Sequence, residues 1–210
     1  QSVVELAEYS SCPVINALTD LYHPCQALAD VLTVMDDGVD LSQQKIAFIG
    51  DANNVSRSLA IICAKLGIAF SIGAPSGYQF EPDFYASLRA EMPAAELSQT
   101  TDPKKAVADA SFVYTDVWTS MGQEAEMAER RKAFSDFQVN SQLMSAAPQH
   151  ARVLHCLPAV RGEEITDDVI DSDQSDVIVQ AGNRMHAQKG LLVWLLNRPW
   201  IEQNVTDAAF

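Results

Sequence analysis

The sequence is built from a repeated unit in which a short apolar run is followed by a polar turn and then by a helix-forming segment. Strands are predicted at residues 45–50, 68–73, 95–99, 111–116, 151–156 and 176–181. Helices are predicted at residues 55–66, 82–91, 103–109, 141–147 and 184–196. Because the strands are apolar on both faces and alternate with helices, the sequence predicts an α/β fold, a doubly wound parallel sheet with helices on both faces.

Helical periodicity is clearest in residues 55–66. Apolar residues recur there at i, i+4, i+7, i+8 and i+11 from Val55, which places them on one face of a helix. Gly67 follows at the position where helices commonly end. Residues 36–44 are rich in Asp, Ser and Gln, and they are predicted to link an opening helical unit to the sheet.

The composition excludes some classes of partner. The 210 residues carry a formal net charge of −14, so the chain lacks the basic surface that nucleic acids and anionic membranes attract. No segment approaches the roughly 20 apolar residues of a membrane-spanning helix, and the opening QSVVELAEYSS is not a signal peptide. Because the chain begins without Met inside a helix-forming pattern, we expect it to be part of something longer.

The cysteines indicate a reducing compartment. No Cys-x-x-Cys pair is present, so the spacing predicts neither a disulfide framework nor a metal site. We therefore expect a cytoplasmic protein. Cys12 and Cys63 are predicted to be structural, whereas Cys25 and Cys156 lie inside motifs.

Three predicted strands end in or are followed by a polar side chain, Asp51, Asp116 and Cys156. Ligands of doubly wound sheets bind at the carboxyl ends of the strands. A single Asp at a strand end caps a turn more often than it does chemistry, but three polar ends at one edge predict a site. The segment after Asp116, DVWTSMGQE, has no obvious periodicity and is a candidate for part of it.

The turn GDANN at residues 50–54 lies between a strand and a helix. It has one glycine where a dinucleotide-binding G-x-G-x-x-G turn needs three, so a nicotinamide or flavin cofactor is disfavoured. Asn53 is predicted to cap the following helix. Asn54 is then free to point toward the edge of the sheet.

The motif YHPCQALAD places His23 and Gln26 at a helix start, where Pro24 is well tolerated. A His and an amide there can hydrogen-bond a carbonyl and an amino group together, because a helix N-terminus attracts oxygen-rich ligands. The alternative is a capped helix with a surface His. Arg184 is predicted in the first turn of the last helix, against the dipole preference, which suggests that it binds an oxygen of a ligand.

The motif HCLPAVRGEEI places Cys156 at a strand end. Neighbouring side chains of a strand point to opposite faces, so His155 is not expected to serve as its base. Cys156 is predicted to make a polar contact rather than to act as a covalent nucleophile, and a buried inert thiol is the alternative.

Taken together, HPCQ-x-LAD, GDANN, DVWTSMGQE, HCLPAVRGEEI and the NRMH helix resemble, in order and spacing, the motifs of ornithine carbamoyltransferases. The resemblance runs through the whole chain, and SMG is its most discriminating part. It implies a two-domain α/β fold, a homotrimer with active sites shared between subunits, a role in arginine metabolism, and no metal or organic cofactor.

The resemblance also implies roles for individual residues. His23 and Gln26 would hold the carbonyl oxygen and amide of the carbamoyl group of carbamoyl phosphate. Arg184 and the backbone of Cys156 and Leu157 would assist there. The α-amino and α-carboxylate groups of ornithine would be held by a second set of residues: Asn54, Asp116, Ser120 and Met121. Asp116 and Cys156 would also lie near its δ-amino group.

One feature of the family does not match. The Ser-Thr-Arg-Thr-Arg loop that binds phosphate in this family does not occur in the 210 residues. We therefore expect residues 1–35 to be a remnant of the carbamoyl phosphate domain, residues 36–182 the ornithine-binding domain, and residues 183–210 a C-terminal helix that packs on the other domain. Residues 1–35 and 184–210 are expected to expose apolar surface unless another chain covers them.

Two alternatives stay open. One is a carbamoyltransferase for N-acetylornithine, succinylornithine or putrescine, although the combination of SMG and Asp116 favours plain ornithine. The other is a non-catalytic α/β ligand-binding module.

Without the phosphate loop, we expect the purified 210-residue chain to bind ornithine weakly and to form citrulline very slowly or not at all. A colorimetric citrulline assay with carbamoyl phosphate and ornithine measures this. Specific activity clearly above the enzyme-free rate would contradict the expectation.

Overall fold

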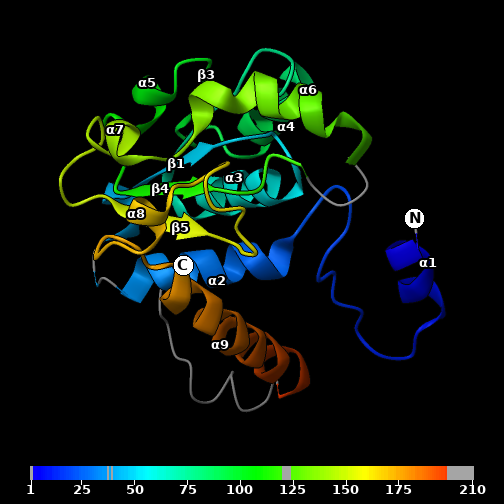
Figure 1. Cartoon of the computed structure of the whole chain (residues 1–210). Helices are drawn as coiled ribbons and strands as arrows, with labels where there is room; N and C mark the ends of the chain where they lie inside the picture. Colours follow the sequence, from blue (N-terminus) through cyan, green and yellow to red (C-terminus); the bar gives the residue numbers. More distant parts are fainter. Residues whose placement is uncertain (1, 37, 39, 120–123, 198–210) are drawn as a thin grey trace.

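The computed structural model describes residues 2–36, 38, 40–119 and 124–197 (Figure 1). Its strands are β1 (Lys45–Ile49), β2 (Ala69–Gly73), β3 (Leu97–Thr100), β4 (Phe112–Thr115) and β5 (Arg152–His155). Its α-helices are α1 (Ser2–Tyr9), α2 (Pro24–Asp36), α3 (Asn54–Leu66), α4 (Pro82–Glu91), α5 (Pro103–Val107), α6 (Met127–Phe134), α7 (Ser141–Met144), α8 (Asp167–Ile170) and α9 (Val177–Leu196). Short 3-10 turns are η1 (Leu41–Gln43), η2 (Glu124–Glu126) and η3 (Ser135–Phe137).

The strands form one parallel sheet in the order β3-β2-β1-β4-β5. The chain runs outward from β1 to β3 and then crosses back to β4, so β1 and β4 are neighbours at the point where the order reverses. Ile49 aligns with Gly73 on one side and with Thr115 on the other, which brings the ends of these strands level. The predicted doubly wound α/β fold is confirmed.

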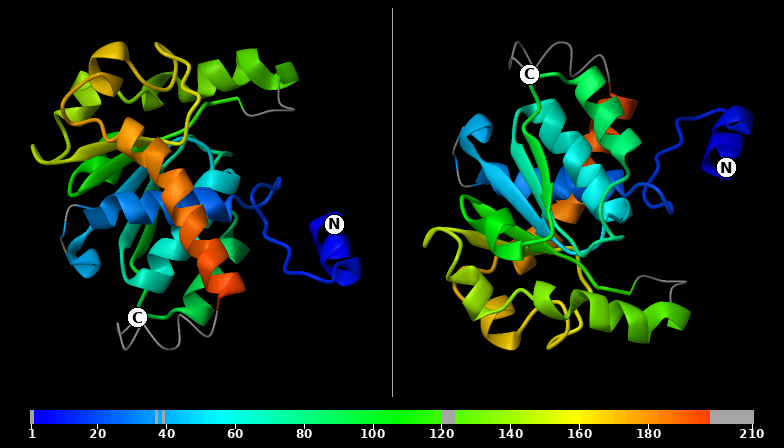
Figure 2. Two further views of the ribbon diagram at one scale, coloured as in Figure 1. Left: turned by 90° about the horizontal axis from the view of Figure 1, so that it is seen from below. Right: turned by 90° about the horizontal axis from the view of Figure 1, so that it is seen from above.

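Helices cover both faces of the sheet (Figure 2), and each face carries its own apolar core. On one face, side chains of α2, α3 and α4 pack around Phe48, Phe70 and Tyr114. On the other, α5, α6, α7 and α8 pack around Ile49 and Val113. Burial on both faces explains why the strands are nearly continuous apolar runs rather than alternating ones.

Local signals set the ends of α3. The Asn53 side chain accepts hydrogen bonds from the backbone N–H groups of Val55 and Ser56, and Gly67 adopts the left-handed conformation with φ of 73°. The predicted N-cap and C-terminal glycine are both confirmed.

β3 begins two residues later than predicted, at Leu97.

The predicted strand at residues 176–181 is wrong, because α9 runs without interruption from Val177 to Leu196. The run Val-Ile-Val favours a strand, yet only Val177 and Gln180 of this stretch are buried, whereas Ile178 is 79% exposed. This spacing of three fits a helix lying against α2. Two sequence-based expectations change as a result: Arg184 lies inside α9 rather than in a first turn, and the expected boundary at residues 182/183 falls within one helix.

Helix α9 packs on α2, and α1 stands apart from the sheet at the end of an extended segment (Figures 1 and 2). Both ends of the described chain expose large apolar side chains, as expected: among others Val4, Leu6, Tyr9, Met185, Leu192, Trp194 and Leu196. Within the described residues, no helix combines the length and the apolar character needed to cross a bilayer.

Two glycines offer a matched test of the packing. A Cβ at Gly73 would lie 3.0 Å from Cδ1 of Ile49 and 3.3 Å from Cα of Pro103, whereas a Cβ at Gly190 in α9 would meet nothing within 4 Å. We expect Gly73→Ala to lower the free energy of unfolding by about 1–3 kcal/mol through overpacking. Gly190→Ala should raise it by about 0.5–1 kcal/mol, because Ala favours helices. Urea denaturation measures both, and equal effects would contradict the packing described for Gly73.

Candidate functional site

The carboxyl ends of β1, β4 and β5 bring Asp51, Asp116 and Cys156 to one edge of the sheet. The Asp116 carboxylate accepts hydrogen bonds from Nδ2 of Asn53 at 2.8 Å, from its neighbour Val117 N at 2.8 Å, and from the Cys156 thiol at 3.0 Å. All three donors are neutral. In the described part of the chain, no Lys, Arg or His side chain forms an ion pair with Asp116.

The two asparagines of GDANN make contacts that differ in part from the prediction. Oδ1 of Asn53 caps α3, and this fixes its Nδ2 toward Asp116. Nδ2 of Asn54 donates instead to the carbonyl of Thr19 at 2.8 Å, in the segment before α2. The cap signal was visible in the sequence, but nothing in it indicated that the capping amide also contacts Asp116.

Asp51 is a second carboxylate at this edge, and its negative charge is compensated by an arginine. The buried guanidinium of Arg130 forms an ion pair with Asp51 and donates from Nε to the carbonyl of Trp118. Burial raises the pKa of Asp51, and the charge of Arg130 opposes that rise. Arg130 thereby ties α6 to the turn after β1 and to the segment that follows Asp116.

The Cys156 thiol is held in its neutral form. Burial raises its pKa well above the usual value, and the negative charge of Asp116 adds to the effect. A neutral thiol that donates to a carboxylate is a polar contact and a weak nucleophile. Cys156 thus makes a polar contact, and its part in a reaction stays a prediction.

His155 is not the base of a Cys–His pair, although the reason differs from the predicted one. Its Nδ1 accepts from the backbone N–H of Leu157 at 2.9 Å, so Nε2 carries the proton and faces Oε1 of Glu164 at 3.1 Å. Both ring nitrogens are therefore engaged within a buried pair. Leu157 has φ of 58° and begins the turn that leaves β5.

The same contacts bear on metal binding. Among the described residues, one group of three potential ligands has its atoms within 4.8 Å of one another: Asp116, His155 and Cys156. His155 has no ring nitrogen to spare, and the thiol is protonated and already bonded to Asp116. As arranged, the group offers a cation one carboxylate and no second free ligand.

A second cluster forms where α2 lies against α9. Nη1 of Arg184 donates to Oε1 of Gln26 at 2.5 Å, joining residues far apart in the sequence. His23 precedes α2, its backbone N–H donates to Oγ of Ser58 at 2.7 Å, and its Nδ1 is buried without a hydrogen-bond partner in the described structure. Burial, and then the charge of Arg184, lower the pKa of His23, so its imidazole is neutral at neutral pH.

A buried carboxyl group lies beneath this cluster. Asp30 is fully buried, one helical turn after Gln26, and burial raises its pKa to about 7. Hydrogen bonds from the amides of Gln180 and Gln26 oppose that rise. The HPCQ-x-LAD motif contains both residues of the turn, but Gln180 was not singled out, because its segment was predicted to be a strand.

The structure thus gathers most of the predicted site residues into two adjacent groups. Gln26 and Arg184 are hydrogen-bonded to each other. His23 lies close enough that the charges of Arg184 and Asp116 both affect the pKa of its imidazole. Asp116 and Cys156 are joined directly. Ser120 and Met121 lie outside the described residues.

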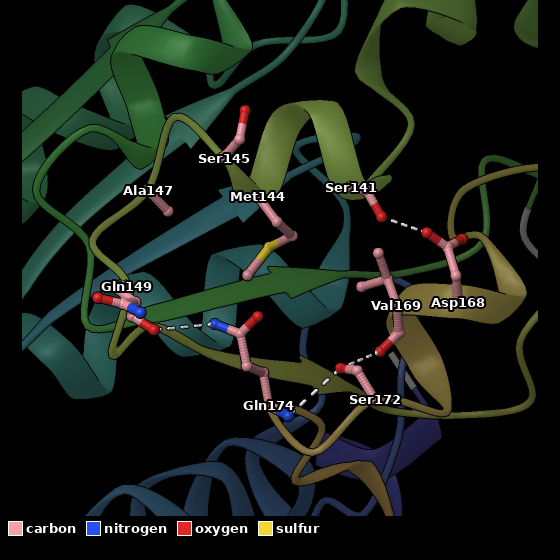
Figure 3. A pocket seen from close by; sticks show the side chains of 9 residues that line it. All are labelled: Ser141, Met144, Ser145, Ala147, Gln149, Asp168, Val169, Ser172 and Gln174. Atoms are coloured by element: carbon pink, nitrogen blue, oxygen red, sulfur yellow. Dashed lines mark hydrogen bonds between the residues drawn. The ribbon is translucent and has the colours of Figure 1, made fainter.

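A cavity of about 470 Å³ lies elsewhere, between α7, α8 and the segment before α9 (Figure 3). Ser141 and Asp168 face each other across one side of it, joined by a hydrogen bond (Figure 3). Its lining holds none of the predicted site residues and, in the part of the chain described, no basic side chain. Nothing there favours an anionic or an amino-acid ligand.

Family models match most of the chain. Residues 42–195 match the Asp/Orn binding domain of aspartate/ornithine carbamoyltransferase, and residues 1–36 match the carbamoyl-P binding domain of the same family. The chain belongs to the aspartate/ornithine carbamoyltransferase family. The resemblance inferred from the motifs is confirmed.

Individual relatives support the same family assignment. The chain is 50% identical over 198 residues to an ornithine carbamoyltransferase of Halalkalibacterium halodurans, a match that covers 93% of the chain and 62% of that protein. It is similar to the structures of the ornithine carbamoyltransferases of Pyrococcus furiosus (TM-score 0.86, 47% identity, 92% and 63% of the two chains) and Gloeobacter violaceus (TM-score 0.85, 41% identity, 93% and 66%). The chain therefore spans somewhat less than two thirds of the length of these relatives.

The raised pKa of Cys156 predicts an order of thiol reactivity. Cys12 is exposed, whereas Cys156 is a neutral thiol at pH 8, so iodoacetamide should alkylate Cys156 at least about tenfold more slowly. Asp116→Asn removes a negative charge that raises the pKa of Cys156, so it should speed alkylation there and leave Cys12 unchanged. Peptide mass spectrometry resolves the two sites. Faster alkylation of Cys156 than of Cys12 in the unchanged protein would show that the thiol is activated.

Proposed function

We propose that the chain provides the ornithine-binding site and part of the carbamoyl site of an enzyme that transfers the carbamoyl group of carbamoyl phosphate to the δ-amino group of L-ornithine. The products are citrulline and phosphate. The nitrogen lone pair attacks the carbamoyl carbon, the bond to the phosphate oxygen breaks, and the nitrogen loses a proton. No metal or organic cofactor takes part in this proposal.

The observation that carries the proposal is the environment of Asp116. Its carboxylate is positioned by three neutral donors and, among the described residues, is paired with no cation. The neighbouring Asp51 carboxylate is instead occupied by Arg130. An uncompensated carboxylate at the carboxyl edge of a parallel sheet suits the ammonium group of an amino acid. Asn54, Ser120 and Met121 complete this half of the proposed site.

The second group of residues suits the carbamoyl moiety. The N–H group of a neutral His23 imidazole and the Arg184 guanidinium can donate hydrogen bonds to a carbonyl oxygen that becomes negative in the transition state. Oε1 of Gln26 lies beside Arg184 and can accept from the carbamoyl NH₂ group. The backbone at Cys156 and Leu157 lies at the same edge and assists there.

The attacking amine must be neutral, and ornithine carries its δ-amino group mostly as ammonium in neutral water. The charge of Arg184 and partial burial of the site favour the deprotonated amine. The neutral Cys156 thiol adds no negative charge that would hold the proton in place.

The setting proposed for the full-length enzyme is a cytoplasmic homotrimer that functions in arginine metabolism. All four cysteines are free thiols, as a reducing compartment permits. The apolar side chains exposed on α1 and α9 suit coverage by other parts of such an assembly.

Three ligands distinguish the proposed substrate from the alternatives. Isothermal titration calorimetry should detect L-ornithine, and N-acetylornithine and putrescine should bind at least about tenfold more weakly. N-Acetylornithine lacks the charged α-amino group, and putrescine lacks the α-carboxylate. Asp116→Asn should reduce ornithine affinity by about tenfold or more, the range of a charge-assisted hydrogen bond.

Asp83→Asn is the matched control, because it makes the same change of charge on the exposed surface of α4. It should leave ornithine affinity unchanged. Equal binding of ornithine and N-acetylornithine would favour the acylated substrate instead. Binding of none of the three ligands would favour a module with another ligand.

A further inference from the structure

The interface of α2 and α9 buries an acid that the proposed reaction does not use. Asp30 has no exposed surface, and in the described structure it forms no ion pair. Burying a carboxyl group among neutral partners is costly, so its position in the HPCQ-x-LAD motif calls for an explanation. The explanation lies in the two amides that it contacts.

A single oxygen of Asp30 receives both amides. Oδ1 accepts from Nε2 of Gln26 at 2.8 Å and from Nε2 of Gln180 at 2.6 Å. Both glutamine side chains are themselves buried. Oδ2 has no partner at hydrogen-bond distance in the described structure, although the buried hydroxyl of Tyr114 is close enough to lower the pKa of the carboxyl group.

These contacts decide which way each amide faces. An amide presents an oxygen at one end and an NH₂ group at the other, and the two ends are almost equal in size. An oxygen that only accepts hydrogen bonds holds both NH₂ groups toward itself. The oxygen of Gln26 is therefore turned to Nη1 of Arg184, and the oxygen of Gln180 to the backbone N–H of His155 at 2.8 Å.

We propose that Asp30 is a positioning residue for carbamoyl transfer, which orients the amide of Gln26 so that its oxygen faces the carbamoyl NH₂ group and Arg184. This rests on the function proposed above. With the amide reversed, Gln26 would present its NH₂ group to a guanidinium and to the NH₂ group of the substrate. Asp30 itself touches no substrate.

The orientation depends on an acceptor oxygen and not on a charge. A proton on Asp30 would occupy the unpartnered Oδ2 and leave Oδ1 to accept both amides. For the same reason Asp30→Asn preserves the arrangement when its oxygen takes the place of Oδ1. Asp30→Leu keeps the branched shape of the side chain, puts larger methyl groups in place of the oxygens, and removes the acceptor.

Citrulline and ornithine provide the test, because they share the amino-acid group and only citrulline carries the carbamoyl group. Measured by NMR titration of the whole chain, Asp30→Leu should weaken citrulline binding about tenfold and change ornithine binding less than twofold. Asp30→Asn should bind both as the unchanged protein does. Thr33→Val is the matched control: it removes a buried 3.1 Å hydrogen bond from Asn183 in the same interface without touching either amide, so citrulline affinity should hold.

The possible outcomes are separable. If the unchanged chain binds neither ligand, the proposed function fails, and this inference fails with it. If it binds citrulline and Asp30→Leu binds citrulline equally well, or loses both ligands to the same degree, only the positioning role is overturned. The outcome for Asp30→Asn tests whether the acceptor alone suffices.

A measurement on the unchanged protein covers the case in which Asp30→Leu does not fold. Side-chain amide resonances of Gln26 and Gln180 should each show one proton shifted downfield by its hydrogen bond to the shared oxygen, with and without ligand. Resonances at the positions of free glutamine amides would overturn the proposal.

Discussion

The parallel pairing of β1 with β4 is the constraint on which the site depends. In a parallel sheet, all strands present their carboxyl ends at one edge, and the reversal of strand order leaves neighbouring connections pointing to opposite faces there. Asp51 and Asp116 are 65 positions apart in the sequence, yet the register of Ile49 with Thr115 brings them within one residue of the same level at this edge. The apolar runs that build the strands therefore also determine where the polar residues meet.

A second constraint is the packing of α9 on α2. It joins Gln26 to Arg184 and Asp30 to Gln180, pairs separated by 158 and 150 residues. The hydrogen bonds of Asp30 with Gln26 and Gln180 are buried, so they must form for the helices to pack, and the contact of Arg184 with Gln26 is partly buried. The packing of α2 on α9 and the placement of Gln26 beside Arg184 therefore depend on the same contacts.

Much of this could be predicted from the sequence, because the signals were local. Apolar runs identified the strands, Asn53 and Gly67 marked the ends of α3, and Asp116 and Cys156 stood at strand ends. The features that the sequence did not predict depend on contacts between distant segments. The Val-Ile-Val run at the start of α9 favours a strand locally, and only packing against α2 makes it helical. The ion pair of Asp51 with Arg130 likewise joins two segments with no common motif.

The distribution of partners explains why one carboxylate of several is available to a ligand. Asp51 is neutralised by Arg130, Glu164 is bonded to His155, and Asp30 receives two amides. Asp116, at the carboxyl edge of the sheet, is held by an asparagine, a thiol and its neighbouring backbone N–H, which fix its direction without cancelling its charge. A cation placed beside Asp116 would compete with the ammonium group of the proposed substrate for its carboxylate. Neutral donors therefore orient Asp116, whereas Arg130 neutralises Asp51 and Arg184 lies on the side of the site that is proposed to bind the carbonyl oxygen.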